Sequence, residues 1–304
     1  MNFISPEISL AAIIPAVILA AYVFFNDRVE KEPIPLLLLL FGAGGISYIP
    51  AYFAERGLTS VIDSLFSDYI TYDFQGVATY SSDLVKYGHG LLVVFVGIAL
   101  IEEVVKWLVM FLITHKNKNF NCLFDGVVYG TFVSLGFAVV ENVIFAWQSG
   151  WDTLVFRTLI SLPGHLYFGI LMGYCYTMWR VYRSAAIAEK EYEERGLIKI
   201  TKSFRSGGWF AAMVVFPILY HGIYGFAEFF RSQISDIVFY VLNGIFFVIC
   251  IVGIHKISRT DTYRGRYADA LLDKKYPETK GICDDIEKDL DVFAEEEGED
   301  HGGQ

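Results

Sequence analysis

The sequence predicts an all-α, polytopic membrane protein with about seven transmembrane helices, its N-terminus outside the cell and its C-terminus in the cytosol. The chain is 54% hydrophobic and only 19% charged, whereas a soluble domain is about 25% charged. Its apolar residues are gathered in long segments, and its cations are gathered in alternate loops. Together these observations predict a multi-pass protein of the cell membrane that contacts the lipid bilayer.

Seven segments are long and apolar enough to cross a bilayer, which takes about 20 mainly apolar residues. They are residues 8–25, 35–54, 88–114, 123–147, 158–179, 208–230 and 237–255. The first, second and seventh are uniformly apolar, whereas the third to sixth contain polar residues and glycines. Helices that face a protein interior differ from lipid-facing helices in this way, so we expect the middle helices to form the interior.

The loops alternate in their content of lysine and arginine, and this predicts the orientation because cytosolic loops are enriched in these residues. One set of loops holds 15 cations and the opposite set holds four. The richer set lies at residues 28–31, 116–118, 180–205 and 256–266. These loops are therefore predicted to be cytosolic, which leaves the N-terminus outside.

We expect a seven-helix membrane domain over residues 1–260, with an extracytoplasmic loop at 55–87 and a cytosolic loop at 181–207. An acidic, largely disordered cytosolic tail is expected at 261–304. From residue 269 to residue 300 the chain has 13 Asp and Glu against four Lys, and such a segment buries too little apolar area to fold. The chain has no basic patch, which argues against a nucleic-acid partner.

Charged side chains stand in the middle of the third predicted helix, where they are costly. Glu102 and Glu103 are followed by Lys106 at spacings of four and three residues, so all three share one helix face. Each charge costs about 2.5–3.5 kcal/mol at the centre of a spanning helix. An ion pair that fixes helix packing is one explanation, and a functional site is the other.

More polar side chains reach a similar depth on the next three helices. Glu141 and Asn142 lie in the fourth predicted helix, His165 in the fifth and His221 in the sixth. Counted from the outer helix ends, the carboxylate and both imidazoles lie about 10–14 Å below the outer surface. A lone membrane histidine is more often a hydrogen-bonded packing residue, but two at the depth of the glutamates indicate one converging site.

This set of side chains can hydrolyse an amide bond in two ways. A glutamate can activate water and then protonate the leaving nitrogen, while a histidine N–H holds the oxyanion. Alternatively, Glu141, His165 and His221 can bind a divalent metal such as zinc, with another glutamate as the base. No HExxH or membrane serine motif is present. A transporter can also use such residues, but the two halves of the chain show no internal repeat.

Several motifs lie at these positions: EExxK at 102–106, FDGVVYGxxxxxGFAxxEN at 124–142, PGH at 163–165, the later His221, and the loop DRVEKEP at 27–33. They resemble the PrsW family of intramembrane proteases, within the superfamily of CAAX-processing and bacteriocin-processing type proteases. The resemblance covers about residues 26–225. It implies an endopeptidase that cuts membrane-anchored proteins, such as anti-sigma-factor-like substrates, near the extracytoplasmic side.

The resemblance also implies site residues. The catalytic set is Glu102, Glu103, Glu141, His165 and His221, with Lys106 and Asn142 in support. Within this set Glu102 resembles the water-activating glutamate, and His221 resembles the oxyanion or ligand histidine. Relatives differ in whether they need a metal, so the cofactor is either none or a divalent metal such as zinc.

One position departs from the family pattern. An Asp or Asn commonly follows the late histidine by four residues, and here that position is Gly225. The same superfamily contains non-catalytic members, so the alternative function is a catalytically silent polytopic scaffold or immunity protein. The protease requires the glutamates and histidines to meet in one pocket inside the bilayer.

Overall fold

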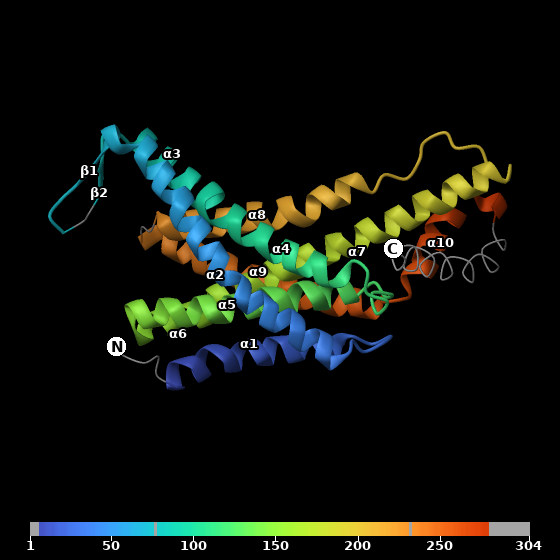
Figure 1. The fold of residues 1–304 in the computed structure, drawn as a ribbon, viewed down its shortest axis with the longest axis horizontal. Coiled ribbons are helices and arrows are strands. Elements are labelled where there is room, and N and C mark those ends of the chain that lie inside the picture. The colour runs from blue at the N-terminus through green and yellow to red at the C-terminus, as the bar shows by residue number, and fades with distance from the viewer. Residues whose placement is uncertain (1–5, 76–77, 231–232, 280–304) are drawn as a thin grey trace, which may run out of the picture.

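The computed structural model describes residues 6–75, 78–230 and 233–279, which form an elongated bundle of helices (Figure 1). The helices, in chain order, are α1 (Pro6–Asn26), α2 (Ile34–Leu65), α3 (Asp83–Leu92), the π-helical segment η2 (Val93–Ala99), α4 (Leu100–Thr114), α5 (Asp125–Ser149), α6 (Trp151–Leu159), α7 (Ser161–Glu194), α8 (Gly207–Phe229), α9 (Gln233–Arg259) and α10 (Arg264–Lys275). The short 3-10 turns are η1 (Ser67–Tyr69) and η3 (Pro277–Thr279). The prediction of an all-α membrane protein is confirmed.

Six helices among the described residues are long and apolar enough to cross a membrane: α1, α2, α5, α7 together with α6, α8 and α9. The predicted crossing at 88–114 is helical throughout, but it is divided among α3, η2 and α4 and carries three charged side chains in its last part. A seventh crossing there remains a prediction, as does the orientation of the chain in the membrane.

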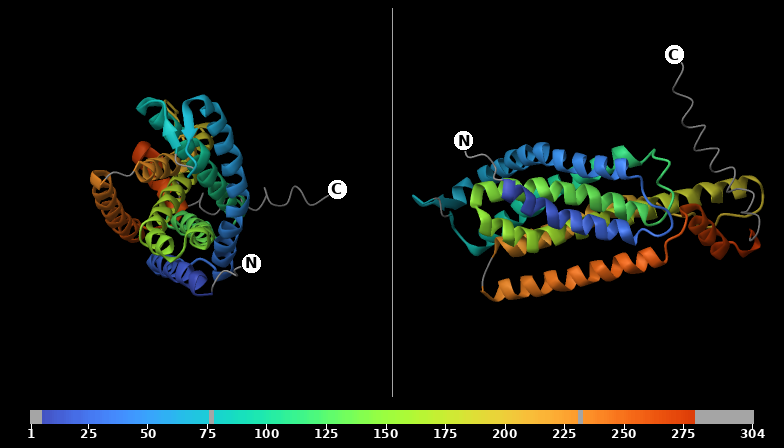
Figure 2. Two further views of the ribbon diagram at one scale, coloured as in Figure 1. Left: turned by 90° about the vertical axis from the view of Figure 1, so that its left-hand side faces the viewer. Right: turned by 90° about the horizontal axis from the view of Figure 1, so that it is seen from below.

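Helix α5 forms the centre of the bundle, between α2 on one side and α7 on the other (Figure 2). Most of its side chains are buried, as expected for an interior helix. Glycines allow the close approach. A Cβ on Gly136 would overlap the carbonyl oxygen of Phe41 in α2, and a Cβ on Gly173 in α7 would overlap that of Gly126. The polar residues of these helices are therefore held at fixed distances across tight interfaces.

Helices extend into both predicted loops. Helix α2 continues to Leu65, and among the described residues the connection from there to α3 holds η1 and an antiparallel hairpin of β1 (Ile70–Tyr72) and β2 (Ala78–Tyr80). In β1, Ile70 is opposite Tyr80. Helix α7 continues to Glu194 and so takes up about half of the expected cytosolic loop at 181–207.

The predicted tail at 261–304 contains a folded part. Residues 264–275 form α10, whose Ala268 and Leu272 pack into an apolar cluster with the end of α7. Glu189 of α7 pairs with Lys275 and accepts a hydrogen bond of 2.6 Å from the Tyr276 hydroxyl. These apolar and polar contacts offset the chain entropy that the acidic composition alone does not. The expected disorder of residues 280–304 lies outside the described residues.

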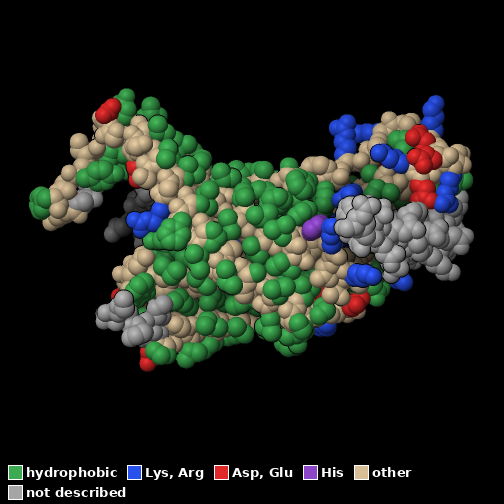
Figure 3. All heavy atoms as spheres, in the orientation of Figure 1, with side chains coloured by type: hydrophobic (Ala, Val, Ile, Leu, Met, Phe, Trp, Pro, Cys, Tyr) green, Lys and Arg blue, Asp and Glu red, His purple; other side chains and the backbone are tan. Residues whose placement is uncertain are grey.

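The face shown in Figure 3 has a wide apolar band across the middle of the bundle, and charged side chains gather at its ends. Lysines and arginines are most numerous at the end that holds α10. Large apolar side chains of the long helices, such as Leu38, Ile46 and Val241, have more than half of their surface exposed. A surface of this kind suits a bilayer rather than water.

Candidate functional site in the membrane

Two of the three carboxylates of the site lie in the first turn of α4. Glu102 and Glu103 are 2% and 0% exposed, and Lys106, one turn later, is fully buried. Its Nζ lies 2.9 Å from Glu102 Oε2 and 2.8 Å from Glu103 Oε1. The expected pairing on one helix face is therefore present, because residues three and four apart stack along a helix.

The π-helical segment η2 lies directly before these residues and is not visible in the sequence pattern. Glu102 and Glu103 follow its last turn and are buried, and π-helical turns occur frequently at functional sites. Phe95 of η2 packs where a Cβ of Gly222 in α8 would stand, and Val94 lies 2.9 Å from the Cβ position of Gly225. The glycine that departs from the family pattern therefore makes room for η2.

Helix α7 supplies the next side chain. His165 is buried, with its Nδ1 at 3.0 Å from Lys106 Nζ and its Nε2 at 3.0 Å from Glu141 Oε2 of α5. Ser134 of α5 donates a 2.7 Å hydrogen bond to the His165 carbonyl oxygen. This imidazole therefore links Lys106 of α4, and through it the two glutamates of that helix, to the Glu141 carboxylate of α5.

Arg157 of α6 is the site residue that sequence reasoning missed. Its Nη2 lies 2.5 Å from Glu141 Oε1, and its Nε donates to Asn142 Oδ1 at 2.8 Å. The sequence shows no cation within a turn of Glu141, and Arg157 stands near the outer end of the next predicted crossing. Its place in the site follows from the short helix α6, which folds back beside α5. The only signal in the sequence was an arginine near the outer end of the crossing that carries His165.

Helix α8 brings the second imidazole. His221 Nδ1 lies 2.9 Å from Glu103 Oε1 and 3.9 Å from Glu102 Oε2. Its ring stacks on Phe168 of α7, with the ring centroids 4.8 Å apart. The contact fixes the plane of the imidazole beside the carboxylates.

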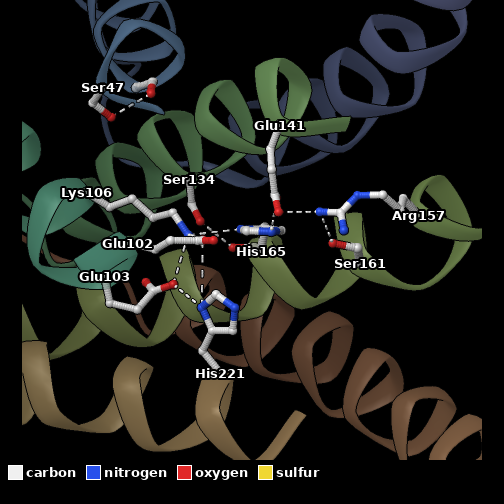
Figure 4. A network of polar contacts seen from close by, with 11 residues as sticks. Ser47, Glu102, Glu103, Lys106, Ser134, Glu141, Arg157, Ser161, His165 and His221 are labelled. Atoms are coloured by element: carbon white, nitrogen blue, oxygen red, sulfur yellow. Dashed lines mark hydrogen bonds and ion pairs between the residues drawn. The ribbon is translucent and has the colours of Figure 1, made fainter. Parts of the chain in front are cut away.

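All of the predicted site residues meet in one cluster, to which five helices contribute (Figure 4). A chain of direct contacts runs from His221 through Glu103 and Lys106 to His165, and on through Glu141 to Arg157. Three carboxylates face two cations, so the cluster holds one excess negative charge when its histidines are neutral. A bound proton or a further cation would neutralise this excess charge.

The donor atoms suit a metal in two overlapping ways. Within the described residues, the groups whose ligand atoms lie within 4.8 Å of one another are Glu102 with Glu103 and His221, and Glu102 with Glu141 and His165. The predicted ligands are thus divided between two groups that share Glu102. Glu103 Oε2 is buried without a hydrogen-bond partner, as an unused ligand atom would be. Lys106 Nζ already touches both glutamates, so a metal there requires the ammonium to move or to lose its proton.

Carboxylates, imidazoles and an ammonium that meet deep inside a bundle of candidate membrane-spanning helices are the groups that a hydrolase acting within the membrane uses. The chain belongs to the PrsW family of intramembrane metalloproteases, because the sequence model of that family matches residues 32–254.

Individual members of the family are also similar. Protease PrsW of Oceanobacillus iheyensis is 28% identical over 71% of this chain and 80% of its own length. The proteins of the same name from Bacillus subtilis and Shouchella clausii are 24% and 26% identical over 78% and 84% of this chain, and over 88% and 97% of their own lengths. No solved structure matches the chain.

Proposed function

We propose that this protein is an intramembrane endopeptidase that hydrolyses peptide bonds of membrane-anchored proteins near the extracytoplasmic side. The observation that carries the proposal is the direct contact of Glu102 and Glu103 with Lys106, and of Glu103 with His221, in a buried cluster. Each group that amide hydrolysis needs is present: a base, a proton donor and an oxyanion donor. Anti-sigma-factor-like proteins are the substrate class that the family suggests.

In the proposed reaction Glu102 takes a proton from water while the water oxygen attacks the peptide carbonyl carbon. The carbonyl oxygen becomes an oxyanion, which a histidine N–H of His221 stabilises. Glu102 then gives the proton to the leaving nitrogen as the C–N bond breaks, which restores the carboxylate. Lys106 holds Glu102 in place through the ion pair between its ammonium and that carboxylate. Glu103 in turn holds the Lys106 ammonium and the His221 imidazole.

Arg157 and His165 have a positioning role in this proposal. Arg157 holds Glu141 and Asn142 together, and Glu141 in turn orients His165. His165 reaches Lys106 through its other nitrogen. The five helices are thus tied to one another through the groups that surround the reacting bond.

A metal fits the same donor atoms, and the family name is that of a metalloprotease. Glu102, Glu103 and His221 would hold it, and it would supply a polarised water and charge for the oxyanion. Metal content of the purified protein tests this: wild type should hold about one equivalent of zinc or another divalent ion, and Glu103→Gln should lose it. A metal-free wild-type protein that still cleaves its substrate in the presence of a chelator would assign the reaction to the glutamate alone.

The protease proposal is tested by comparing shed extracellular protein fragments from cells with wild-type protein and with Glu102→Gln. The substitution keeps the shape of the side chain and removes the base, so the fragments of true substrates should disappear. Glu7→Gln, an exposed position on α1, is the matched control and should leave the fragments unchanged. Equal fragments in wild type and Glu102→Gln, at equal protein abundance, would refute the role of Glu102.

The alternative is a silent scaffold, and one observation favours it: the polar cluster is closed by its own ion pairs. In a scaffold these pairs only hold helices together. Glu102→Gln and His221→Ala would then lower the abundance of the folded protein and would change no fragment at matched abundance. In a protease both variants lose cleavage while enough folded protein remains to measure.

A further inference from the structure

An apolar pocket lies between α7, α8 and α9, outside the polar cluster. Its lining is mostly aromatic and includes Gly164, Phe168, Ile223, Ala227, Phe239 and Asn243. Asn243 donates its amide N–H to the backbone carbonyl of Phe239 at 2.9 Å. The pocket is thus suited to an apolar group and carries no charge.

The pocket shares its walls with the catalytic cluster. Phe168 lines the pocket and stacks on the ring of His221 at 4.8 Å. Gly164, which precedes His165, lies on the same wall, where a Cβ would stand 3.5 Å from Phe168 and 3.8 Å from Tyr224. A group in the pocket therefore lies one side chain away from both imidazoles of the site.

The pocket opens toward lipid. Ile223 of α8 lines it and has 59% of its surface exposed. Helix α9, which forms the opposite wall, is the least buried of the six candidate spans. A group that enters here comes from the hydrocarbon layer, where a membrane-anchored protein has its transmembrane segment.

We propose that this pocket seats one apolar side chain of the substrate's transmembrane segment, beside the peptide bond to be cut. The inference rests on the proposed protease function, because it takes the neighbouring cluster as the catalytic one. Continuity with that cluster through Phe168 identifies the occupant as substrate rather than a structural lipid. The pocket then sets specificity, since one methylene group in an apolar pocket changes discrimination about tenfold or more.

Binding is measured separately from cleavage with a defined probe, a single-span peptide of leucine and alanine that carries one photoreactive leucine in its outer half. The peptide and the full-length Glu102→Gln variant are placed together in phosphatidylethanolamine–phosphatidylglycerol vesicles and irradiated, and the cross-links are mapped by mass spectrometry. We expect cross-links in residues 223–227 and 239–247, reduced about tenfold by Ala227→Phe, which fills the pocket.

Ala211→Phe is the matched control because Ala211 is an exposed alanine of the same helix, and it should leave the cross-links unchanged. Cross-links that survive in Ala227→Phe, or that fall mainly on exposed residues outside these two ranges, such as Val252, would overturn the proposal. A phospholipid with a photoreactive acyl chain is the second probe. Labelling of the pocket by this lipid, with no competition from the peptide, would make the occupant a lipid and would also overturn it.

Cleavage of the same peptide series, with leucine or alanine at the scanned position, gives the second measurement. In the otherwise wild-type protein, Ala227→Phe should lower the ratio of leucine to alanine cleavage about tenfold, whereas Ala211→Phe should not. An equal loss for both peptides would make the pocket a packing feature rather than a specificity site. If the peptide cross-links at the pocket but no membrane-anchored protein is cut, the protease proposal fails while the binding site stands.

Discussion

The replacement Lys106→Met removes the ammonium at the centre of the cluster and leaves a side chain of similar length. The two ion-pair contacts, of 2.8 Å and 2.9 Å, are each worth about 6 kcal/mol at an effective dielectric constant of about 20. Desolvation of the ammonium and the carboxylates offsets most of this gain, and loss of one partner from a buried pair costs about 3–5 kcal/mol. We therefore expect Lys106→Met to lower the free energy of unfolding by about 3–5 kcal/mol.

The assay is unfolding in mixed detergent micelles, followed by circular dichroism. Leu108→Met is the control, because Leu108 is exposed on the same helix and the exchange should change stability by less than about 0.5 kcal/mol. Lys106→Met leaves the carboxylates of Glu102 and Glu103 without their ammonium. The double variant Glu103→Gln/Lys106→Met removes one of these two charges, so its free energy of unfolding should be about 1.5 kcal/mol or more above that of Lys106→Met. A loss below about 1 kcal/mol in Lys106→Met, or additive losses in the double variant, would refute the account of the cluster.

Three further variants test other parts of the molecule. Arg157→Met should destabilise the protein by about 3 kcal/mol and reduce cleavage, because Glu141 is left buried without its cation; Arg157→Lys, which keeps the charge, should be intermediate in both. Gly136→Ala should cost about 3 kcal/mol in detergent unfolding because its Cβ overlaps α2, whereas Gly42→Ala, with no atom within 4 Å, should be neutral or slightly stabilising. Asp27→Asn should raise the melting temperature at pH 8 and leave it nearly unchanged at pH 4.

The pH dependence at Asp27 follows from its position in the connection after α1. Burial raises the pKa of its carboxyl to about 6, while Lys31 acts in the opposite direction and Asp261 adds to the rise. Since the pKa in the folded state lies above the unfolded value, the protonated form favours folding and stability is lost as the pH rises from about 4 to about 6. An equal effect of Asp27→Asn at both pH values would contradict this.

For Arg157, uncleaved substrate in Arg157→Lys at wild-type stability would place Arg157 closer to the reaction.

The residues of the polar cluster could be predicted from the sequence because each of them is polar or charged within an otherwise apolar segment. Glu102, Glu103 and Lys106 stand in an otherwise apolar segment, so their cost demands partners or a use. Depth counting along four helices was enough to bring His165 and His221 to the same layer. The structure places all of these side chains in one network, as expected.

Other features depended on information that local patterns do not carry. Arg157 was counted only as an outer-loop cation because its partner, Glu141, is 16 residues away and α6 was not expected. Composition does not encode the packing of α10 on α7, which stabilises the part of the tail before about residue 276, where the predicted disorder begins. The seventh crossing stays a prediction for a related reason, because hydropathy alone does not distinguish one interrupted helix from the separate segments α3, η2 and α4.

The π-helical segment η2 takes up an extra residue between α3 and α4. An α-helix advances by about 100° per residue and a π-turn holds about one residue more than an α-turn, so deletion of one residue between Val93 and Ala99 would let the segment become α-helical with α3 and α4 close to their present phase. Helical-wheel diagrams drawn from Asp83 onward therefore assign Glu102 to the wrong face, although the residue itself lies within the bundle. In homologous sequences, a gap of one residue at this point would mark loss of the π-helical turn rather than damage to the polar cluster that begins on α4.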